Sequence, residues 1–344
     1  MSGQIEQRGE TVLADQKNTL KGSIVVIVRN GESSIRACLE SLLRQTVQCE
    51  IIVVDGNSTD RTQEIVREFP VKLVVAPRLD SYGISRNIGV QSSTGDVILF
   101  MDADDYCDES WAENLVNNFQ NDPQVGIVTV PREPIETTGW FMKVLEYEYD
   151  AAARRGKAKS DLPAQKKQRD WTSVTTKGTA WLKKAITDAG GFDGAMFFGT
   201  EDKDLAFRIN KAGYKVVEDP SAKIRVAPVG SASNFIKDKY WRAGVGHGYM
   251  RRKYGVYRPP LGAVATILFA GAAAFLLIIG QPWLSLTSIG LSCLTLSSLA
   301  KEGVRLRSVG APAGPTIKFL FVKWLSRLAE FAGFFRGYLK FKRR

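Results

Sequence analysis

Two aspartates one residue apart, Asp102 and Asp104, directly follow the apolar run Val97–Met101. The run is too short for a membrane span and follows a Gly-Asp turn, so it predicts a strand buried on both faces, as in a parallel sheet. In open α/β sheets, ligands bind at the carboxyl ends of the strands. Two carboxylates there can share a hard divalent cation that also bridges phosphate oxygens. An acidic turn after a strand is also often merely solvated, so the rest of the chain must decide.

A second acidic pair, Glu201 and Asp202, stands at the start of a predicted helix. Leu205, Ile209 and Ala212 recur at helical spacing after it. Carboxylates at a helix N-terminus are stabilised by the helix dipole, which is a structural reason for their presence. The chemical alternative is that one of them is a general base, which takes the proton from an attacking hydroxyl group.

Alternating strand and helix patterns precede and surround these residues. Residues 24–28, 51–54 and 72–76 are apolar runs that predict strands, and a helix is predicted from about residue 33. Strands that alternate with helices predict an α/β fold with a Rossmann-like, mostly parallel sheet. The Gly-x-Gly-x-x-Gly fingerprint is missing after the first strand, which argues against a nicotinamide or flavin cofactor.

The 344-residue chain carries a net charge of +11 that is unevenly distributed. Residues 301–344 carry +9 and residues 237–258 carry +6, so subtracting both leaves −4 for residues 1–236. A nucleic-acid binder would show a basic stripe across its folded domain, so no nucleic-acid partner is expected. The four cysteines have no metal or redox spacing, and we expect packing residues in a reducing compartment.

Residues 259–300 contain no charged side chain. At about 1.5 Å per residue, a helix over residues 261–280 could cross a hydrocarbon core of about 30 Å. Gln281-Pro282-Trp283 interrupts the pattern before a second, weaker apolar stretch at 284–300. The pattern predicts a transmembrane hairpin, with a buried hairpin of a soluble protein as the alternative. Lys and Arg on both outer flanks predict an integral protein of the cell membrane whose folded domain and C-terminus are cytoplasmic.

Helical patterns also occur at 140–149 and 317–332. The second places apolar residues on one face and Lys323, Arg327 and Glu330 on the other, which predicts a helix in the membrane interface with its basic groups toward anionic lipid. A helix packed on the folded domain is the alternative. The expected organisation is a disordered segment 1–20, a folded domain 21–236, a basic juxtamembrane segment 237–258, the hairpin 259–300 and a basic interfacial tail 301–344.

Four blocks of the sequence resemble the family 2 glycosyltransferases, which have the GT-A fold. In chain order over residues 22–217 they are VVIVRNGESSIRACLESLLRQT, EIIVVDGNSTDRT, SRNIGVQSSTGDVILFMDADD and GGFDGAMFFGTEDKDLAFRINKAGYKV. The resemblance implies transfer of a sugar from a nucleotide-sugar donor, most often a UDP-sugar, with inversion at the anomeric carbon and with Mg²⁺ or Mn²⁺ as cofactor.

The resemblance also implies roles on the nucleotide side of the site. Asp55, at the end of the second strand, would contact the base of the nucleotide, and the segment with Arg29 and Glu32 would line the base pocket. The family often has proline where this chain has Ile27, so the first block departs from the family pattern and leaves the identity of the base open.

Further implied roles concern the diphosphate and the acceptor. Arg86 would lie near the donor, Asp102 would approach the ribose and the metal, and Asp104 would ligate Mg²⁺ or Mn²⁺. Asp202 would be the general base. Asp105 is expected only to cap the segment that follows.

The Gln-x-x-Arg-Trp motif of processive family members is missing from residues 237–242, and two spans are too few for a polymer channel. We therefore expect addition of a single sugar, with a lipid-linked glycan as acceptor. Within residues 131–170, the basic stretch 151–169 predicts a mobile loop or a flap over the site. A polyprenyl-phosphate glycosyltransferase, whose ionised acceptor needs no base, and a non-catalytic membrane scaffold remain alternatives, and homo-oligomerisation stays open.

Overall fold

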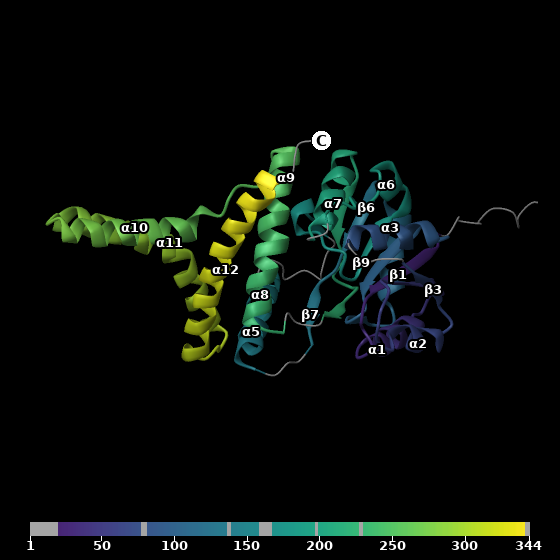
Figure 1. Ribbon diagram of the computed structural model, residues 1–344. Coiled ribbons are helices and arrows are strands. Elements are labelled where there is room, and N and C mark those ends of the chain that lie inside the picture. Colours follow the sequence, from purple (N-terminus) through teal and green to yellow (C-terminus); the bar gives the residue numbers. More distant parts are fainter. Residues whose placement is uncertain are drawn as a thin grey trace, which may run out of the picture.

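The computed structural model describes residues 20–76, 81–135, 139–157, 167–196, 199–226 and 230–340. Figure 1 shows an α/β body, a group of long helices beside it, and a helical hairpin that projects away from both. Residues 1–19 of the predicted disordered segment lie outside the described residues, as do parts of the predicted 131–170 loop and residues 341–344 of the predicted tail.

An eight-stranded sheet forms the centre of the body, in the order β3-β2-β1-β4-β9-β6-β10-β8. Its strands are β1 (Gly22–Val28), β2 (Glu50–Asp55), β3 (Lys72–Val75), β4 (Val97–Asp102), β6 (Val125–Thr129), β8 (Lys167–Gln168), β9 (Thr179–Leu182) and β10 (Lys215–Glu218). The first four strands pair in parallel, whereas β9 runs antiparallel between β4 and β6. The predicted mostly parallel α/β sheet and its four early strands are confirmed.

Helices cover both faces of this sheet. On one face are α1 (Ile35–Leu43), α2 (Thr62–Arg67) and α4 (Trp111–Asn121), and on the other are α3 (Tyr82–Ser92), α6 (Lys183–Asp188) and α7 (Glu201–Lys211). Side chains of β1 alternate between the two cores: Ile24 and Val26 belong to the first, and Val25 belongs to the second. Burial on both faces explains why the strands are continuous apolar runs.

A small second sheet stands beside the main one, in the order β5-β11-β7. Its strands are β5 (Tyr106–Cys107), β7 (Arg132–Pro134) and β11 (Ile224–Val226). β7 is followed by α5 (Trp140–Lys157), which confirms the predicted helix at 140–149 and extends it. The prediction of a loop from residue 151 is therefore wrong as far as Lys157, and residues 158–166 lie outside the described residues.

The segment after residue 230 is helical and is attached to the body by polar contacts. It forms α8 (Ala232–Asp238), the π-helix η2 (Lys239–Val245) and α9 (Gly246–Tyr254). The Lys253 ammonium lies 2.9 Å from carboxylate oxygens of both Asp193 and Asp204, and the Tyr254 hydroxyl donates to Asp204 at 2.8 Å. Asp204 is fully buried, so this helix is fixed to the first turn of α7.

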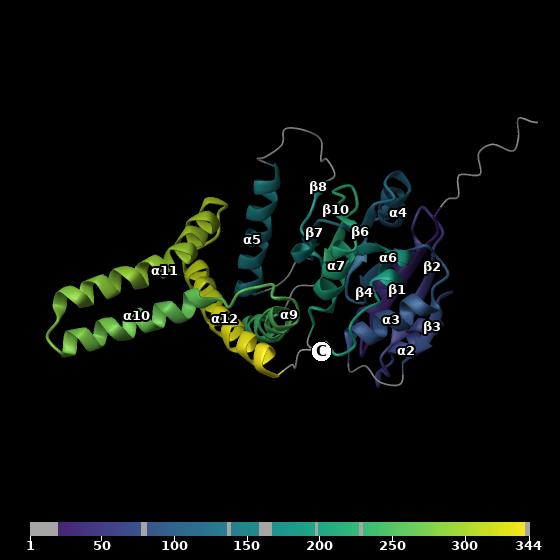
Figure 2. The same ribbon diagram turned by 90° about the horizontal axis from the view of Figure 1, so that it is seen from above.

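The last helix, α12 (Ala313–Lys340), packs along α9 and η2 (Figures 1 and 2). Gly333 and Gly337 of α12 face η2, and a Cβ on either residue would overlap a backbone carbonyl oxygen, that of Tyr240 or that of Val245. The two backbones therefore meet with no side chain between them.

The buried side of α12 includes Phe319, Val322 and Phe334, whereas Phe321 and Leu339 are exposed. The alternative of a helix packed on the folded part of the chain is thus present in the structure. Contact with lipid through the exposed residues stays a prediction. The expectation that Lys323 faces lipid is wrong, because it forms ion pairs with Glu148 of α5 and Glu302.

The uncharged segment forms a helical hairpin of α10 (Leu261–Ile278) and α11 (Pro282–Ser308), which extends away from the other helices (Figure 2). Leu268, Ile278 and Trp283 are 65%, 83% and 79% exposed. Among the described residues no single helix has both the length and the apolar composition to cross a bilayer, although two arms of α11, bent by 46°, meet these criteria together. The hairpin is confirmed as a structure, and its insertion in a membrane stays a prediction.

The close contact between α12 and η2 predicts that Gly337→Ala destabilises the protein. The added methyl group would force the helices apart, at a cost of about 1–3 kcal/mol in the free energy of unfolding. Thermal unfolding of the detergent-solubilised protein measures the effect. Gly314→Ala in the same helix is the control, since a Cβ there meets no atom of the described part of the chain within 4 Å. Equal midpoints for the two variants would contradict the contact.

Candidate active site

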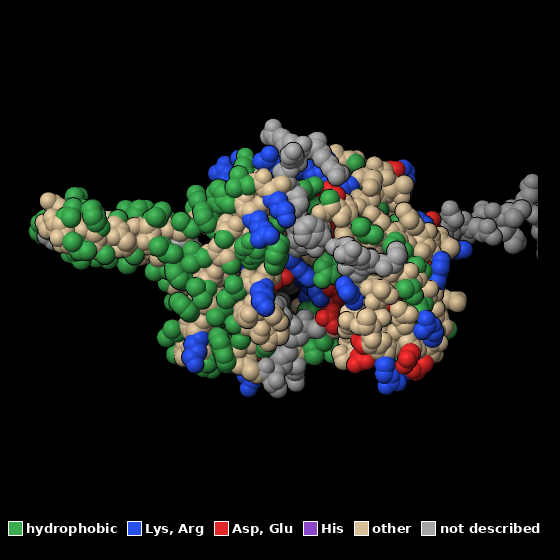
Figure 3. Space-filling model, viewed as in Figure 1, with side chains coloured by type: hydrophobic (Ala, Val, Ile, Leu, Met, Phe, Trp, Pro, Cys, Tyr) green, Lys and Arg blue, Asp and Glu red, His purple; other side chains and the backbone are tan. Residues whose placement is uncertain are grey.

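A cavity of about 750 Å³ lies at the carboxyl ends of β1 and β4. Its wall is completed by residues of α3, by residues 175–177 before β9, by the start of α7, and by η2. In Figure 3 the hollow lies near the middle of the face, with basic and acidic side chains gathered in it. The cavity is thus at the sheet edge that the sequence predicts for ligands.

An acidic cluster of Asp102, Asp104 and Asp105 stands at the end of β4. One carboxylate oxygen from each residue lies within 4.8 Å of those of the other two. Three hard oxygen donors at this separation fit the ligand preference of Mg²⁺ or Mn²⁺. Asp105 is fully buried and contributes to the cluster, so its predicted role as only a cap is too narrow.

The ammonium group of Lys177 lies within the acidic cluster. It is 2.9 Å from Oδ2 of Asp102, 3.1 Å from Oδ2 of Asp105 and 3.9 Å from Oδ1 of Asp104. Burial would lower the pKa of Lys177, but the three carboxylates raise it, so the amine is a resident cation. Burial would likewise raise the pKa of Asp102, but Lys177 and Arg86 hold it below its usual value. Sequence reasoning missed Lys177 because only folding brings residue 177 to the end of β4.

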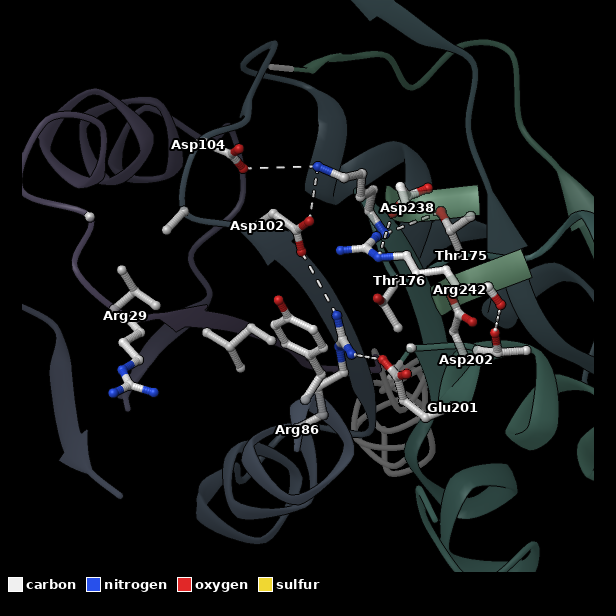
Figure 4. A pocket seen from close by; sticks show the side chains of 18 of the residues that line it. Arg29, Arg86, Asp102, Asp104, Thr175, Thr176, Glu201, Asp202, Asp238 and Arg242 are labelled. Carbon is white, nitrogen blue, oxygen red and sulfur yellow. Dashed lines mark hydrogen bonds and ion pairs between the residues drawn. The ribbon is translucent and has the colours of Figure 1, made fainter. Parts of the chain in front are cut away.

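Arg86 connects the acidic cluster to the second acidic motif. Its side chain is only 7% exposed, and its guanidinium forms an ion pair with Glu201 and lies 3.9 Å from Asp102 (Figure 4). Burial raises the pKa of Glu201, whereas Arg86 lowers it. The other carboxylate oxygen of Glu201, Oε2, is buried and has no hydrogen-bond partner among the residues that the structure describes. Arg86 lines the cavity, its contact with a donor stays a prediction, and its pairing with Glu201 was not predicted from the sequence.

Asp202 lies in the first turn of α7 and lines the cavity, and its role as a general base stays a prediction. Thr200, directly before this helix, has φ +81°, a left-handed conformation that costs about 1–3 kcal/mol in a residue with a side chain. Its hydroxyl donates to the carbonyl oxygen of Arg242 at 2.6 Å, and a Cβ on Gly246 would overlap it. The C-terminal helices therefore hold the turn that presents Asp202.

The predicted nucleotide-side residues divide into two groups. Arg29 is exposed and lines the cavity, apart from the acidic cluster (Figure 4). Glu32 and Asp55 are not among its lining residues. Glu32 accepts a hydrogen bond from the backbone N–H of Arg61 at 3.0 Å. Asp55 is fully buried and accepts from the Gln63 side chain at 2.7 Å. In this structure both carboxylates order the loop after β2, and their contact with a base stays a prediction.

The π-helix η2 supplies lining residues that sequence reasoning did not include in the site. Lys239 and Arg242 line the cavity, and the Arg242 Nε lies 2.9 Å from Asp238. The guanidinium of Arg242 also lies 5.8 Å from the ring centroid of Tyr82 on α3. The signal in the sequence is the excess of basic residues at 237–258, which by itself predicts a juxtamembrane segment.

Residues 23–190 match the protein-family model described as "Glycosyl transferase family 2". The chain carries a glycosyl transferase family 2 domain. The resemblance predicted from the four sequence blocks is therefore confirmed. The domain brings Asp102, Asp104 and Arg86 of the predicted site to one cavity, where Asp202 also lies.

Relatives named as glycosyltransferases agree with this family. Over 126 residues the chain is 32% identical to the "Putative glycosyltransferase EpsH" of Bacillus subtilis. The aligned region covers 35% of this chain and 36% of that protein. Over 226 residues it is 29% identical to the "Probable glycosyltransferase YdaM" of the same organism. This aligned region covers 60% of this chain and 51% of that protein. The chain thus spans about a third and a half of the length of these relatives.

Structural similarity extends the GT-A-like fold over most of the chain. A crystal structure of the mannosyltransferase PcManGT from Pyrobaculum calidifontis, in complex with GDP-Man and Mn²⁺, superposes with a TM-score of 0.57 at 19% identity. The match covers 94% of this chain and 88% of that protein. At this identity the likeness shows the shared fold.

The position of Lys177 predicts competition between its amine and a metal ion. We expect Lys177→Met to bind Mn²⁺ about tenfold more tightly than the wild type when no nucleotide is present, because the amine leaves the shared carboxylate oxygens. Electron paramagnetic resonance of free Mn²⁺ measures the affinity. Lys72→Met is the control, since the Lys72 amine donates to the Ser92 carbonyl oxygen, remote from the cluster. Unchanged or weaker Mn²⁺ binding by Lys177→Met would contradict the competition.

Proposed function

We propose that this protein is an inverting glycosyltransferase that moves a single sugar from a nucleotide-sugar donor to a hydroxyl group of an acceptor. The observation that carries the proposal is the joint presence, in one cavity, of the acidic cluster of Asp102, Asp104 and Asp105 and of Asp202. Arg86 bridges these two groups through Asp102 and Glu201. The family 2 domain and the GT-A-like fold support the same chemistry.

The acidic cluster is the proposed binding site for the diphosphate of the donor. Asp102, Asp104 and Asp105 would hold Mg²⁺ or Mn²⁺, which when bound would neutralise charge on the leaving diphosphate. Lys177 and Arg86 add positive charge beside it, and Arg29 lies farther along the cavity, where the nucleoside would extend. The structural neighbour with GDP-Man and Mn²⁺ supports a nucleotide-sugar, and we propose a UDP-sugar as the first donor to test.

Asp202 is the proposed general base. A single inverting displacement requires a group that accepts the proton of the attacking hydroxyl, on the side of the sugar opposite the leaving diphosphate. Asp202 lines the cavity and accepts a hydrogen bond only from the backbone N–H of Lys203 among the described residues, so one oxygen is available to a hydroxyl group. A polyprenyl-phosphate glycosyltransferase would not need this base.

Two aspartate variants test the function. In wild type, one of UDP, GDP, dTDP and CMP should raise the thermal midpoint in the presence of Mn²⁺, since ligand at 100 times its dissociation constant adds about 2.7 kcal/mol. Asp104→Asn should abolish the shift. Asp202→Asn should keep it but slow transfer of labelled sugar into membrane lipid extracts by about 10²–10⁴-fold.

Asp96→Asn is the matched control, because Asp96 lies at the opposite end of β4, where it accepts from the backbone N–H of Lys21. It should behave as wild type in both assays. No shift with any nucleotide in folded protein would favour the non-catalytic scaffold. Full transfer by Asp202→Asn would favour the polyprenyl-phosphate reaction.

We further propose that the protein is held at the cytoplasmic face of the cell membrane, with the hairpin of α10 and α11 in the lipid. Exposed apolar side chains along the hairpin and on α12, together with the basic residues that flank both, support this location. A lipid-linked acceptor is then within reach of the cavity.

Flotation with vesicles of phosphatidylethanolamine and phosphatidylglycerol tests the location. Wild type should float and stay bound in about 1 M salt, where the Debye length is about 3 Å and attraction between surface charges and lipid is screened. Replacing Leu268, Ile278 and Trp283 by Asp should move most of the protein to the bottom fraction, because each charge is costly in hydrocarbon. Val75→Asp, at an exposed position of β3, is the control. Wild type that does not float would contradict the proposal.

A further inference from the structure

Positive charges in the cavity outnumber the carboxylates that neutralise them. Lys177 pairs with the acidic cluster, Arg86 with Glu201, and Arg242 with Asp238. Among the described residues, four lining cations then have no carboxylate in an ion pair. Arg29 is one, on the nucleotide side, and the other three are Arg132, Lys203 and Lys239, which we call the basic cluster.

The basic cluster is assembled from three elements that are distant in sequence. Arg132 lies on β7, Lys203 in the first turn of α7 and Lys239 at the start of η2. Lys203 directly follows the proposed base Asp202. Neither lysine is fully exposed, and the Lys239 ammonium lies 5.5 Å from the ring centroid of Phe235. The two lysines are therefore partly buried in the wall of the cavity, and Arg132 is an exposed residue that also lines it.

The charges of Arg132 and Lys239 bear on the pKa of Lys203, and all three residues line the cavity. Burial lowers the pKa of Lys203, and the charges of Lys239 and Arg132 lower it further, against the opposing effects of Asp202 and Glu330. Glu330 belongs to α12 and also lies 3.5 Å from His247. Like charges kept close in a partly buried site are costly unless an anion shares the site.

We propose that the basic cluster binds a phosphate or diphosphate group of the acceptor, beside the hydroxyl that Asp202 deprotonates. The inference rests on the proposed function and gives its acceptor a chemical class, a phosphate ester. The donor diphosphate has its own cations, Lys177 and Arg86, at the acidic cluster. A second bound anion would neutralise the three cations next to Asp202, which form no ion pair with a carboxylate among the described residues.

Binding of phosphate probes tests the proposal on the full-length protein in detergent. Geranyl diphosphate and ribitol 5-phosphate are titrated calorimetrically, each against its neutral alcohol, with the donor site filled by Mn²⁺ and the stabilising nucleotide and again in chelator without nucleotide. Lys203→Met and Lys239→Met should each weaken phosphate binding by about tenfold or more, as expected for a lost hydrogen bond to a charged group. Lys203→Arg should retain most of the affinity.

Lys237→Met is the matched control, because Lys237 is an exposed lysine two residues before Lys239 and does not line the cavity. Tighter binding of geranyl diphosphate would indicate a lipid-linked source of the phosphate, and tighter binding of ribitol 5-phosphate a polyol phosphate; either supports the proposal. It is overturned if phosphate probes bind no better than the alcohols, if the nucleotide displaces them, or if both Met variants bind as wild type. A failed nucleotide shift in wild type would instead reject the proposed function, and the titration in chelator does not depend on it.

Discussion

The buried guanidinium of Arg86 is the interaction on which the geometry of the site depends. It lies between the end of β4 and the first turn of α7, and it forms an ion pair with Glu201 while approaching Asp102. Removing one partner of a buried ion pair leaves the other charge uncompensated, which costs about 3–5 kcal/mol. The two acidic motifs are therefore held at a fixed separation, which a transfer between two bound molecules requires.

The C-terminal helices complete the site rather than merely follow it. η2 contributes Lys239 and Arg242 to the wall of the cavity, and its other side packs directly on the glycines of α12. The same segment accepts the hydrogen bond of Thr200, whose left-handed backbone precedes Asp202. The helix α12 is thus connected to the turn that carries the proposed base through η2, by a close backbone contact and one hydrogen bond.

Several features were predictable because they depend on short stretches of chain. The apolar runs of β1, β2 and β4 identify buried strands whose carboxyl ends must lie at one edge, so Asp102 and Asp104 could be placed there from sequence. The four sequence blocks indicated the family before the fold was known. By contrast, the sequence predicts a loop from residue 151, where the structure continues α5 to Lys157. The reason is that the small and basic residues after this point have no clear apolar period.

By itself, the sequence determined the alternating α/β pattern, the acidic motifs and the uncharged hairpin, since each depends on residues that are close together in the chain. Only the tertiary structure decided which charges meet. Lys177 enters the acidic cluster, Lys323 pairs with Glu148 and Glu302 instead of facing outward, and Arg132, Lys203 and Lys239 converge beside Asp202. The physical reason is that electrostatic energy depends on distance in space, and residues 21 to 175 positions apart become neighbours only when the elements pack.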